Sequence, residues 1–543
     1  MKHLLLFVFS LASLIGFSQT SITATIPYQG YDETQAFLGQ GEYQIFMDTT
    51  DGVLDKPVIL VDGFDPGDTR DIAGMYSSLD YDATNIADQL RAEGFDVVLL
   101  NFPTYTRASD NIEVNGGVDY IQRNAMVLVE LINQINSQKT GSQELVVVGP
   151  SMGGLISRYA LRYMEQNSLT HETRLFVSWD TPHKGANIPM NLQYLMNYFA
   201  EGINGGNADL QATVASTLGS PASKEMLIDQ YSAHLQNGST YLQDSNILLP
   251  TGATNFRDAF QAEIDAMGFP QQTRNISIAN GSSNGTMIGT PGMEILNHTF
   301  DLSDVAQDTT MDIILHFTPP ANQTIEVTRA TIINTTLGFP VTVDDFGASS
   351  QSFSYTDGLD SAPGGKYDLQ DFLGNVQGNA VVTELLANLQ QSEFCFIPML
   401  SAMAIDNEND WYASFDSNTQ NTPFDAYFLP TVNEDHVTPT IANVAFALDE
   451  IRVGVVAVSQ NNFDTLFQLK SNPVVTELVI LNKQHIPLID VSIYAITGQQ
   501  VVHKSVVNSG GQFNLPIELS NGVYFLKVTV DGAVYMKKFI VKK

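Results

Sequence analysis

The segment V-V-V-G-P-S-M-G-G-L-I-S-R (146–158) contains a serine in a setting typical of a nucleophile. Its apolar start predicts a buried strand, the G-x-S-x-G sequence centred on Ser151 predicts a sharp turn, and the residues that follow predict a helix. Gly149 and Gly153 lack the Cβ atoms that would collide at such a turn. A serine presented in this way can attack a carbonyl carbon, provided that a neighbouring base accepts its proton.

His436 is the predicted base. It lies in N-E-D-H-V-T-P (433–439), after the strand-like run C-F-I-P-M-L (395–400) and before a helical pattern over residues 441–451. Where a serine stands on this kind of turn, the histidine follows the last strand of the sheet and precedes a final helix. The rival is His183, but its setting D-T-P-H-K-G is typical of a structural loop after a strand.

The acid that would orient the histidine is predicted to be Asp360, in the turn-forming segment T-D-G-L-D-S-A-P-G-G (356–365). The order nucleophile, acid, base along the chain places this acid between the serine and the histidine. Asp357 is the first alternative, and Asp180 and Asp406 also remain open. Each of these aspartates could instead stabilise its own turn through its side chain.

Strands and helices alternate through the first half of the chain, which favours a parallel sheet in a doubly wound α/β fold. Right-handed connections would bring its strands side by side, with the serine at the end of one of them. The predicted strands are residues 58–61, 97–100, 145–148, 175–179 and 274–279, and the predicted helices are residues 84–93, 120–135 and 152–163.

Two insertions are predicted in this fold. Residues 187–270 fall between the sixth and seventh strands and contain apolar helical patterns at 190–199 and 226–234, so they are expected to form a lid or an ordinary cap. Residues 309–355 contain runs rich in branched side chains, separated by Pro-Pro and Gly, which predict an added β layer. The runs are residues 312–317, 324–331 and 341–343.

Composition excludes several classes of function. The formal charge of −34, with 25 basic and 59 acidic residues, disfavours nucleic acid as a partner. Cys395 is the single cysteine, so no intramolecular disulfide is possible. The acidic D-N-E-N-D run at 406–410 lacks the glycine and terminal glutamate of an EF-hand, so we expect a solvated loop there and no metal. No cofactor is implied.

Both ends of the chain point to export. Residues 1–18 combine Lys2 with an apolar run and a small-residue exit, which predicts a signal peptide over residues 1–19. Residues 464–543 contain eight lysines and five acidic residues, a formal charge of +3, whereas the preceding residues carry −37. This change predicts a domain boundary, with the main domain at 20–460. Alternating runs and turn residues in the tail predict a small antiparallel sandwich.

Three segments of the main domain resemble lipase-like α/β-hydrolases. They are V-I-L-V-D-G-F-D-P (58–66), G-P-S-M-G-G (149–154) and D-T-P-H-K-G (180–185), and the resemblance extends over most of residues 40–460. It implies a Ser-His-Asp triad and an oxyanion hole formed by the backbone N–H groups of Phe64 and Met152. The D-x-A-P-G-G loop of similar secreted proteins favours Asp360 as the acid. The family often has His-Gly where this chain has Asp-Gly at 62–63.

The tail is similar to the C-terminal sorting domain of the type IX secretion system of Bacteroidetes. The similarity rests on S-N-P-V (471–474), V-S-I-Y-A-I-T-G-Q-Q-V (491–501), N-G-V-Y-F-L-K-V (521–528) and K-K-F-I-V-K-K (537–543). Such tails address a protein to the outer-membrane secretion machinery and carry no catalysis. The resemblance therefore implies that the protein is secreted or displayed on the cell surface.

Together these features predict an exported serine hydrolase that cleaves carboxylic esters, with an ester or a lipid as its substrate. Two alternatives remain open. The same triad could cleave an amide or peptide bond, or the fold could persist in a catalytically inactive surface-binding protein, because a fold alone does not establish an activity.

Overall fold

A computed structural model describes residues 19–304, 306–370, 380–406, 410–417, 420–456, 463–484, 486–495, 500–530 and 533–543. The predicted signal peptide, apart from its last residue, lies outside the described residues and stays a prediction. The chain divides into two compact units, Met1–Leu448 and Asp449–Lys543.

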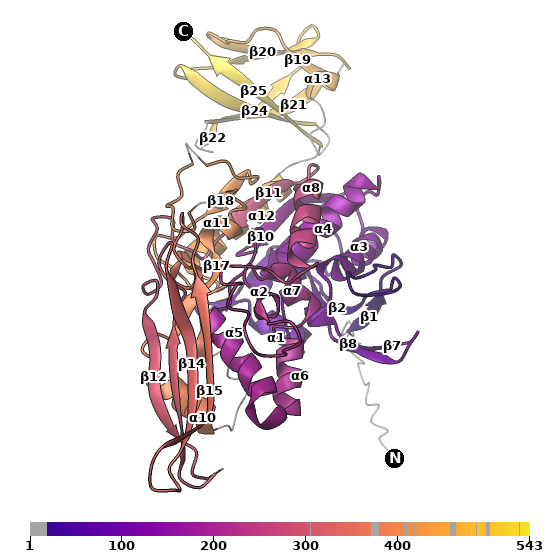
Figure 1. Ribbon diagram of the computed structural model, residues 1–543. Coiled ribbons are helices and arrows are strands. Elements are labelled where there is room, and N and C mark those ends of the chain that lie inside the picture. Colours follow the sequence, from indigo (N-terminus) through magenta and orange to yellow (C-terminus); the bar gives the residue numbers. More distant parts are fainter. Residues whose placement is uncertain are drawn as a thin grey trace, which may run out of the picture. The chain divides into compact units, whose positions relative to one another are not determined.

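The first unit is built on an eight-stranded mixed sheet (Figure 1). The strands β1 and β2 are antiparallel to their neighbours, and the six that follow are parallel to one another. In spatial order they are β1 (Thr20–Thr23), β2 (Gln40–Phe46), β6 (Asp96–Asn101), β3 (Pro57–Val61), β9 (Leu145–Pro150), β10 (Thr173–Trp179), β11 (Arg274–Ile278) and β18 (Ala426–Phe428).

Continuous apolar runs explain the parallel part of this sheet. Every residue of β3 and β6 is buried, as expected for strands covered on both faces. The chain passes from β3 to β6 in one direction and from β6 to β9 in the other, so right-handed connections place α2 on one face and α3 on the opposite face. The predicted doubly wound α/β fold is confirmed.

The helices of this core have boundaries set by local signals. In α2, Asn85 accepts hydrogen bonds from the first turn, and Gly94 follows the helix with φ 86°. The helices are α1 (Ile72–Ser77), α2 (Ile86–Ala92), α3 (Ile121–Gln138), α4 (Met152–Gln166), α8 (Arg257–Met267), α11 (Met399–Ala402) and α12 (Ile441–Val456). Two short hairpins complete this part of the unit: β4 (Asp80–Tyr81) with β5 (Thr84–Asn85), and β7 (Thr104–Arg107) with β8 (Ile112–Asn115).

The segment between β10 and β11 contains α5 (Met190–Asn197), α6 (Ala208–Ser216), α7 (Pro221–Met226) and α8. The helix expected over residues 226–234 is wrong, because Met226 ends α7 and only a short 3-10 turn follows at Tyr231–His234. Arg158 of α4 donates to the carbonyls of Ile264 and Gly268, which anchors α8 to the core. The lid function of this segment stays a prediction.

The added β layer is larger than the sequence suggested. It is a four-stranded antiparallel sheet beside the α/β core (Figure 1), made of β12 (Glu294–Asp301), β13 (Thr309–His316), β14 (Thr324–Asn334) and β15 (Val341–Gln351). Its apolar face packs on α5. The chain then forms β16 (Gly364–Asp368), α10 (Ala380–Asn388) and β17 (Glu393–Pro398). Residues 395–400 therefore do not supply the last strand of the central sheet, which is β18.

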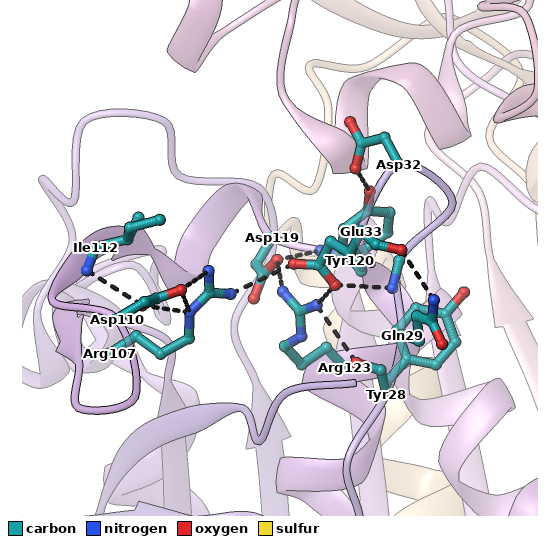
Figure 2. A network of polar contacts seen from close by, with 11 residues as sticks. Tyr28, Gln29, Asp32, Glu33, Arg107, Asp110, Ile112, Asp119, Tyr120 and Arg123 are labelled. Carbon is teal, nitrogen blue, oxygen red and sulfur yellow. Dashed lines mark hydrogen bonds and ion pairs between the residues drawn. The ribbon is translucent and has the colours of Figure 1, made fainter. Parts of the chain in front are cut away.

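Two arginines bind the segment around Glu33, which precedes β2, to the first turn of α3 (Figure 2). Arg123 pairs with Asp119 at 2.7 Å and with Glu33, and Arg107 pairs with Glu33 at 3.3 Å and with Asp110 at 2.7 Å. The Arg123 side chain is only 2% exposed, so its charge needs these carboxylates. The network holds the segment before β2 and the β7–β8 hairpin against the core.

The second unit is an antiparallel β sandwich with its own apolar core, as predicted for the tail. A three-stranded sheet has the order β19-β20-β23, and a four-stranded sheet has the order β22-β21-β24-β25. The elements are α13 (Phe463–Leu466), β19 (Phe467–Leu469), β20 (Glu477–Asn482), β21 (Leu488–Ala495), β22 (Gln500–Val507), β23 (Gln512–Pro516), β24 (Gly522–Val530) and β25 (Ala533–Val541).

Candidate active site

Ser151 lies on a strained turn between β9 and α4. Its backbone has φ 52° and ψ −131°, a conformation that residues other than glycine rarely adopt. The turn is possible because Gly153 has no side chain: a Cβ there would overlap the carbonyl oxygen of Val61 and lie 2.8 Å from that of Asp62. The start of α4 thus packs directly on the end of β3, and the predicted strand, turn and helix are present.

A continuous chain of hydrogen bonds joins three side chains. His436 Nε2 lies 2.8 Å from Ser151 Oγ, and His436 Nδ1 lies 2.7 Å from Asp180 Oδ2. A carboxylate beside Nδ1 favours the tautomer that carries its proton there, which leaves Nε2 free to accept the serine proton. The Phe396 ring and the imidazole make a T-shaped contact, with ring centroids 4.9 Å apart. The arrangement can perform nucleophilic chemistry with general-base assistance.

Asp180 is the residue that directly follows β10, and it is fully buried. Because Trp179 pairs with Pro150 on one side and with Ile278 on the other, the ends of β9, β10 and β11 lie side by side. Asp180 has φ 45°, its N–H donates to the carbonyl of Ile278 at 2.6 Å, and its Oδ1 accepts from the N–H of Asn280 at 3.0 Å. The carboxylate is therefore fixed from both sides.

Gly365 of β16 lies against this carboxylate. A Cβ at Gly365 would overlap Asp180 Oδ2 and lie 2.9 Å from Asp180 Cγ. The next residue, Lys366, accepts a hydrogen bond from the N–H of His436 at 2.8 Å. The A-P-G-G loop thus contributes to the site through its second glycine and the residue after it.

The loop after β3 approaches the serine from the other side. A Cβ at Gly63 would lie 3.3 Å from Ser151 Cβ, so this loop is in contact with the nucleophile turn. Arg70 Nε donates to Asp62 Oδ1 at 2.7 Å, and Arg70 Nη2 donates to the Phe64 carbonyl at 3.3 Å. Burial raises the pKa of Asp62 to about 6, and its Oδ2 has no hydrogen-bond partner among the described residues.

The two predicted oxyanion donors flank the serine in this arrangement. Met152 is the first residue of α4, and the N–H groups of a helix's first turn have no partner within the helix. Phe64 directly follows Gly63, which contacts Ser151. Their role as donors stays a prediction at this point, since it depends on where a substrate oxygen would lie.

The predicted pairing of Asp360 with His436 is wrong. Asp360 is buried, and its carboxylate accepts from the N–H of Thr318 at 2.7 Å, from Thr318 Oγ1 at 3.0 Å and from Asn187 Nδ2 at 3.0 Å. Burial raises its pKa. Asp360 therefore joins the β insertion to the loop after β10. Asp357, the first alternative, accepts from the N–H of Ala321 at 2.7 Å.

Of the remaining candidates, Asp180 is the aspartate that contacts the histidine, whereas Asp406 and His183 have other partners. Asp406 pairs with Lys184 at 2.5 Å, and its side chain is 81% exposed. His183 is fully buried beside Ser178 Oγ, 2.8 Å from its Nε2, and burial lowers the pKa of His183 well below its ordinary value. It is a neutral structural histidine and does not contact Ser151.

One functional signal was within reach of the sequence. Asp180 directly follows a predicted strand neighbouring the one that carries the serine, which is where α/β folds gather site residues. The roles of Asn280 and Gly365 had no such signal, because they depend on contacts between distant segments.

The described residues were compared with the requirements of a metal site and of a membrane-spanning helix. Within the described part of the chain, no group of three or more His, Cys, Asp or Glu side chains could hold a metal ion. Residues 407–409 of the acidic run lie outside that part. None of the helices in the described ranges combines the length and the apolarity that crossing a bilayer requires.

Family models match one segment in each of the two units. Residues 54–245 match a PGAP1-like alpha/beta domain, and residues 471–542 match a secretion system C-terminal sorting domain. The protein thus carries an α/β-hydrolase domain followed by a sorting domain of the type IX kind. No curated protein matches the chain.

Solved structures similar to the chain include several hydrolases. Est1E from Butyrivibrio proteoclasticus is 11% identical over 31% of this chain and 55% of its own, with a TM-score of 0.18. An α/β serine hydrolase without lid from Xanthomonas campestris is 15% identical over 30% and 62%, with a TM-score of 0.20. Fungal esterases from Rhizomucor miehei are 12% identical over 48% and 67%, with a TM-score of 0.24. The chain spans between half and two thirds of the first two.

Proposed function

We propose that this protein is an exported serine hydrolase that cleaves carboxylic esters through Ser151, His436 and Asp180. The observation that carries the proposal is the unbroken chain of hydrogen bonds from Ser151 Oγ through the imidazole to the Asp180 carboxylate, 2.8 Å and 2.7 Å long. Such a chain supplies the nucleophile, the general base and the orienting acid of acyl transfer through a serine, and the strained turn at the end of a parallel strand presents the hydroxyl.

The reaction proceeds in two halves. Ser151 Oγ attacks the ester carbonyl carbon while its proton passes to His436 Nε2, and the C–O bond to the alcohol breaks as His436 returns that proton to the leaving oxygen. Water then attacks the acyl carbon, His436 takes a proton from it, and Ser151 regains a proton as the carboxylic acid leaves. Asp180 holds the imidazole and stabilises its charged form.

The N–H groups of Phe64 and Met152 would receive the negative oxygen of each tetrahedral intermediate. One such donor is worth about 3 kcal/mol of barrier, because it is already oriented before charge develops. The ion pair of Arg70 with Asp62 supports this role, since it fixes the loop that carries Phe64.

The test uses the mature protein, Ser151→Ala and Asp180→Asn. We expect wild type to hydrolyse p-nitrophenyl esters and to react with a fluorophosphonate probe, and Ser151→Ala to do neither. Asp180→Asn should lower kcat by on the order of 10⁴-fold. Absence of both labelling and turnover in wild type would refute the hydrolase. Faster turnover of matched p-nitroanilides would indicate an amidase and not an esterase. The preferred acyl length would distinguish an esterase from a lipase.

The second part of the proposal is the route by which the protein is exported. We expect the signal peptide at residues 1–19 to direct the chain across the inner membrane and the sorting domain to direct it through the outer membrane. In a host with type IX secretion, removal of residues 471–543 should leave the protein in the periplasm. Surface display of the shortened chain would contradict this route.

A further inference from the structure

Asn280 joins the acid to the loop that carries the base. It lies two residues beyond the end of β11 and is fully buried. Its N–H donates to Asp180 Oδ1 at 3.0 Å, and its carbonyl accepts from the N–H of Glu434 at 2.8 Å. Its side chain accepts from the N–H of Val437 at 3.1 Å through Oδ1 and donates to Glu434 Oε2 at 2.9 Å through Nδ2. One residue thus contacts both the acid and the loop that carries the base.

The loop around His436 needs such contacts because its backbone is strained. Val437 has φ 52°, a region that β-branched residues rarely occupy. Besides Asn280, Lys366 holds this loop: its N–H donates to the carbonyl of Glu434 at 2.9 Å and its carbonyl accepts from the N–H of His436. The direction of the imidazole therefore depends on groups outside its own segment.

Glu434 completes the arrangement from within the loop. Its Oε2 accepts from Asn280 Nδ2 and, at 3.5 Å, from Asn443 Nδ2, while Asn443 also donates to the carbonyl of Thr438 at 3.0 Å. Burial raises the pKa of Glu434. A carboxylate in this place requires donors, and the two asparagine amides supply them.

We propose that Asn280 is a positioning residue that sets the geometry between His436 and Asp180, with Glu434 as its anchor in the histidine loop. Asn280 is fully buried, and its hydrogen bonds reach Asp180 and the histidine loop and not Ser151, so it acts through the other two residues. This inference rests on the proposed function, because it assigns Asn280 a role in the same reaction.

Asn280→Ala tests the side chain alone, because the N–H that bonds Asp180 remains. We expect kcat on a p-nitrophenyl ester to fall by about 10- to 100-fold, as for a reacting group displaced by a fraction of an ångström, with KM changed by less than about threefold. The matched control is Asn275→Ala at the opposite end of β11, since Asn275 is buried and also makes two side-chain hydrogen bonds. It should keep kcat within about threefold.

Reversal of the hydrogen bond gives a rescue that packing alone does not predict. Asn280→Asp places two carboxylates in contact, so its kcat should fall at neutral pH, and the ratio of its kcat to that of wild type should rise toward acid pH as one of them gains a proton. When Glu434→Gln is added to Asn280→Asp, the new amide at position 434 can donate to the carboxylate at position 280, which reverses the direction of the wild-type hydrogen bond. This double variant should recover at least a third of the lost activity. Glu434→Gln alone keeps an amide oxygen that can accept from Asn280, so its kcat should fall less than that of Asn280→Asp.

The outcomes separate the two proposals. Near wild-type kcat in Asn280→Ala, or failure of the double variant to recover activity, would overturn the role of Asn280 while leaving the hydrolase intact. If wild type neither labels nor turns over, the proposed function fails, and a crystal structure of Asn280→Ala still decides the inference. A separation between His436 Nδ1 and Asp180 Oδ2 that stays at 2.7 Å in that variant would refute it.

Discussion

Replacement of Gly365 by alanine is expected to stop most ester hydrolysis while the protein stays folded. The added Cβ would overlap the Asp180 oxygen that accepts from His436 Nδ1 and would lie 2.9 Å from Asp180 Cγ. Carbon and oxygen atoms in ordinary contact are about 3.3–3.6 Å apart. The carboxylate oxygen must therefore move by roughly 1.5 Å or β16 must move away, taking Lys366 and its bond to His436 with it.

The size of the effect follows from that displacement. A misplacement of about 1 Å in a catalytic group costs on the order of 10²-fold in rate. Complete loss of the acid's function costs on the order of 10⁴-fold. We therefore expect kcat of Gly365→Ala to fall by between about 10² and 10⁴, with KM nearly unchanged because the methyl group faces the acid and not the substrate. Overpacking should lower stability by about 1–3 kcal/mol.

The assay measures kcat and KM on p-nitrophenyl butyrate together with thermal unfolding. Gly74→Ala in α1 is the matched control, because its Cβ would lie 3.4 Å from the nearest atom and cause no overlap. A double-variant cycle makes the test specific. In an Asp180→Ala background the methyl group has room, so Gly365→Ala should have no further effect there.

Two results would refute this reasoning. Near wild-type kcat in a folded Gly365→Ala would mean that catalysis does not depend on the present position of the Asp180 carboxylate. Additive effects of Gly365→Ala and Asp180→Ala would mean that the methyl group acts on something other than the acid.

Three further substitutions test other parts of the structure. Asp360→Asn should lower the free energy of unfolding by about 1–3 kcal/mol, because three donors converge on that carboxylate, and should keep kcat/KM within about threefold. A drop in kcat/KM as large as that of Asp180→Asn would restore Asp360 as the acid. The pKa of Asp62 rises from 3.8 to about 6 on folding, so the free energy of unfolding of wild type should fall by up to about 3 kcal/mol relative to Asp62→Asn as the pH rises from 3.8 to about 6. Urea unfolding of both proteins at pH 4 to 7.5 measures this difference, and a difference that does not change with pH would contradict the prediction. Arg123→Met leaves the buried Asp119 carboxylate without its ion pair, although Glu33 keeps Arg107, and should cost about 3–5 kcal/mol in urea unfolding with kcat of the folded fraction retained. An unchanged midpoint would contradict the importance of the network.

Local patterns were sufficient for the parts of the site that depend on local structure. An apolar run before G-x-S-x-G predicts a strand ending in a sharp turn, and the structure has that turn at Ser151. His436 was predicted from chain order alone, and it lies within hydrogen-bond distance of Ser151 Oγ. The fold class followed from alternating strands and helices, because buried parallel strands carry nearly continuous apolar runs.

The acid could not be predicted in the same way, because its place depends on how distant segments meet. The D-x-A-P-G-G loop does reach the site, but Gly365 contacts the acid while the Asp360 side chain points to Thr318. Sequence alone does not give the direction of a side chain in a loop. The extent of the β layer was underestimated for a related reason, since β12 lies outside the branched run that marked the insertion.

The register of the sheet explains how β10 can supply the acid. Trp179 pairs with Ile278, so the residues that follow β10 and β11 emerge side by side, and an acid on either strand would reach the same histidine loop. Residue 280 supports that acid through its backbone, because its N–H donates to Asp180 Oδ1, while its side chain contacts the histidine loop. A carboxylate side chain at this position would lie against Glu434, whose Oε2 accepts from Asn280 Nδ2, and two like charges in contact disfavour each other's ionised form. The amide of Asn280 avoids that repulsion, so the identity of residue 280 follows from the loop that carries the base.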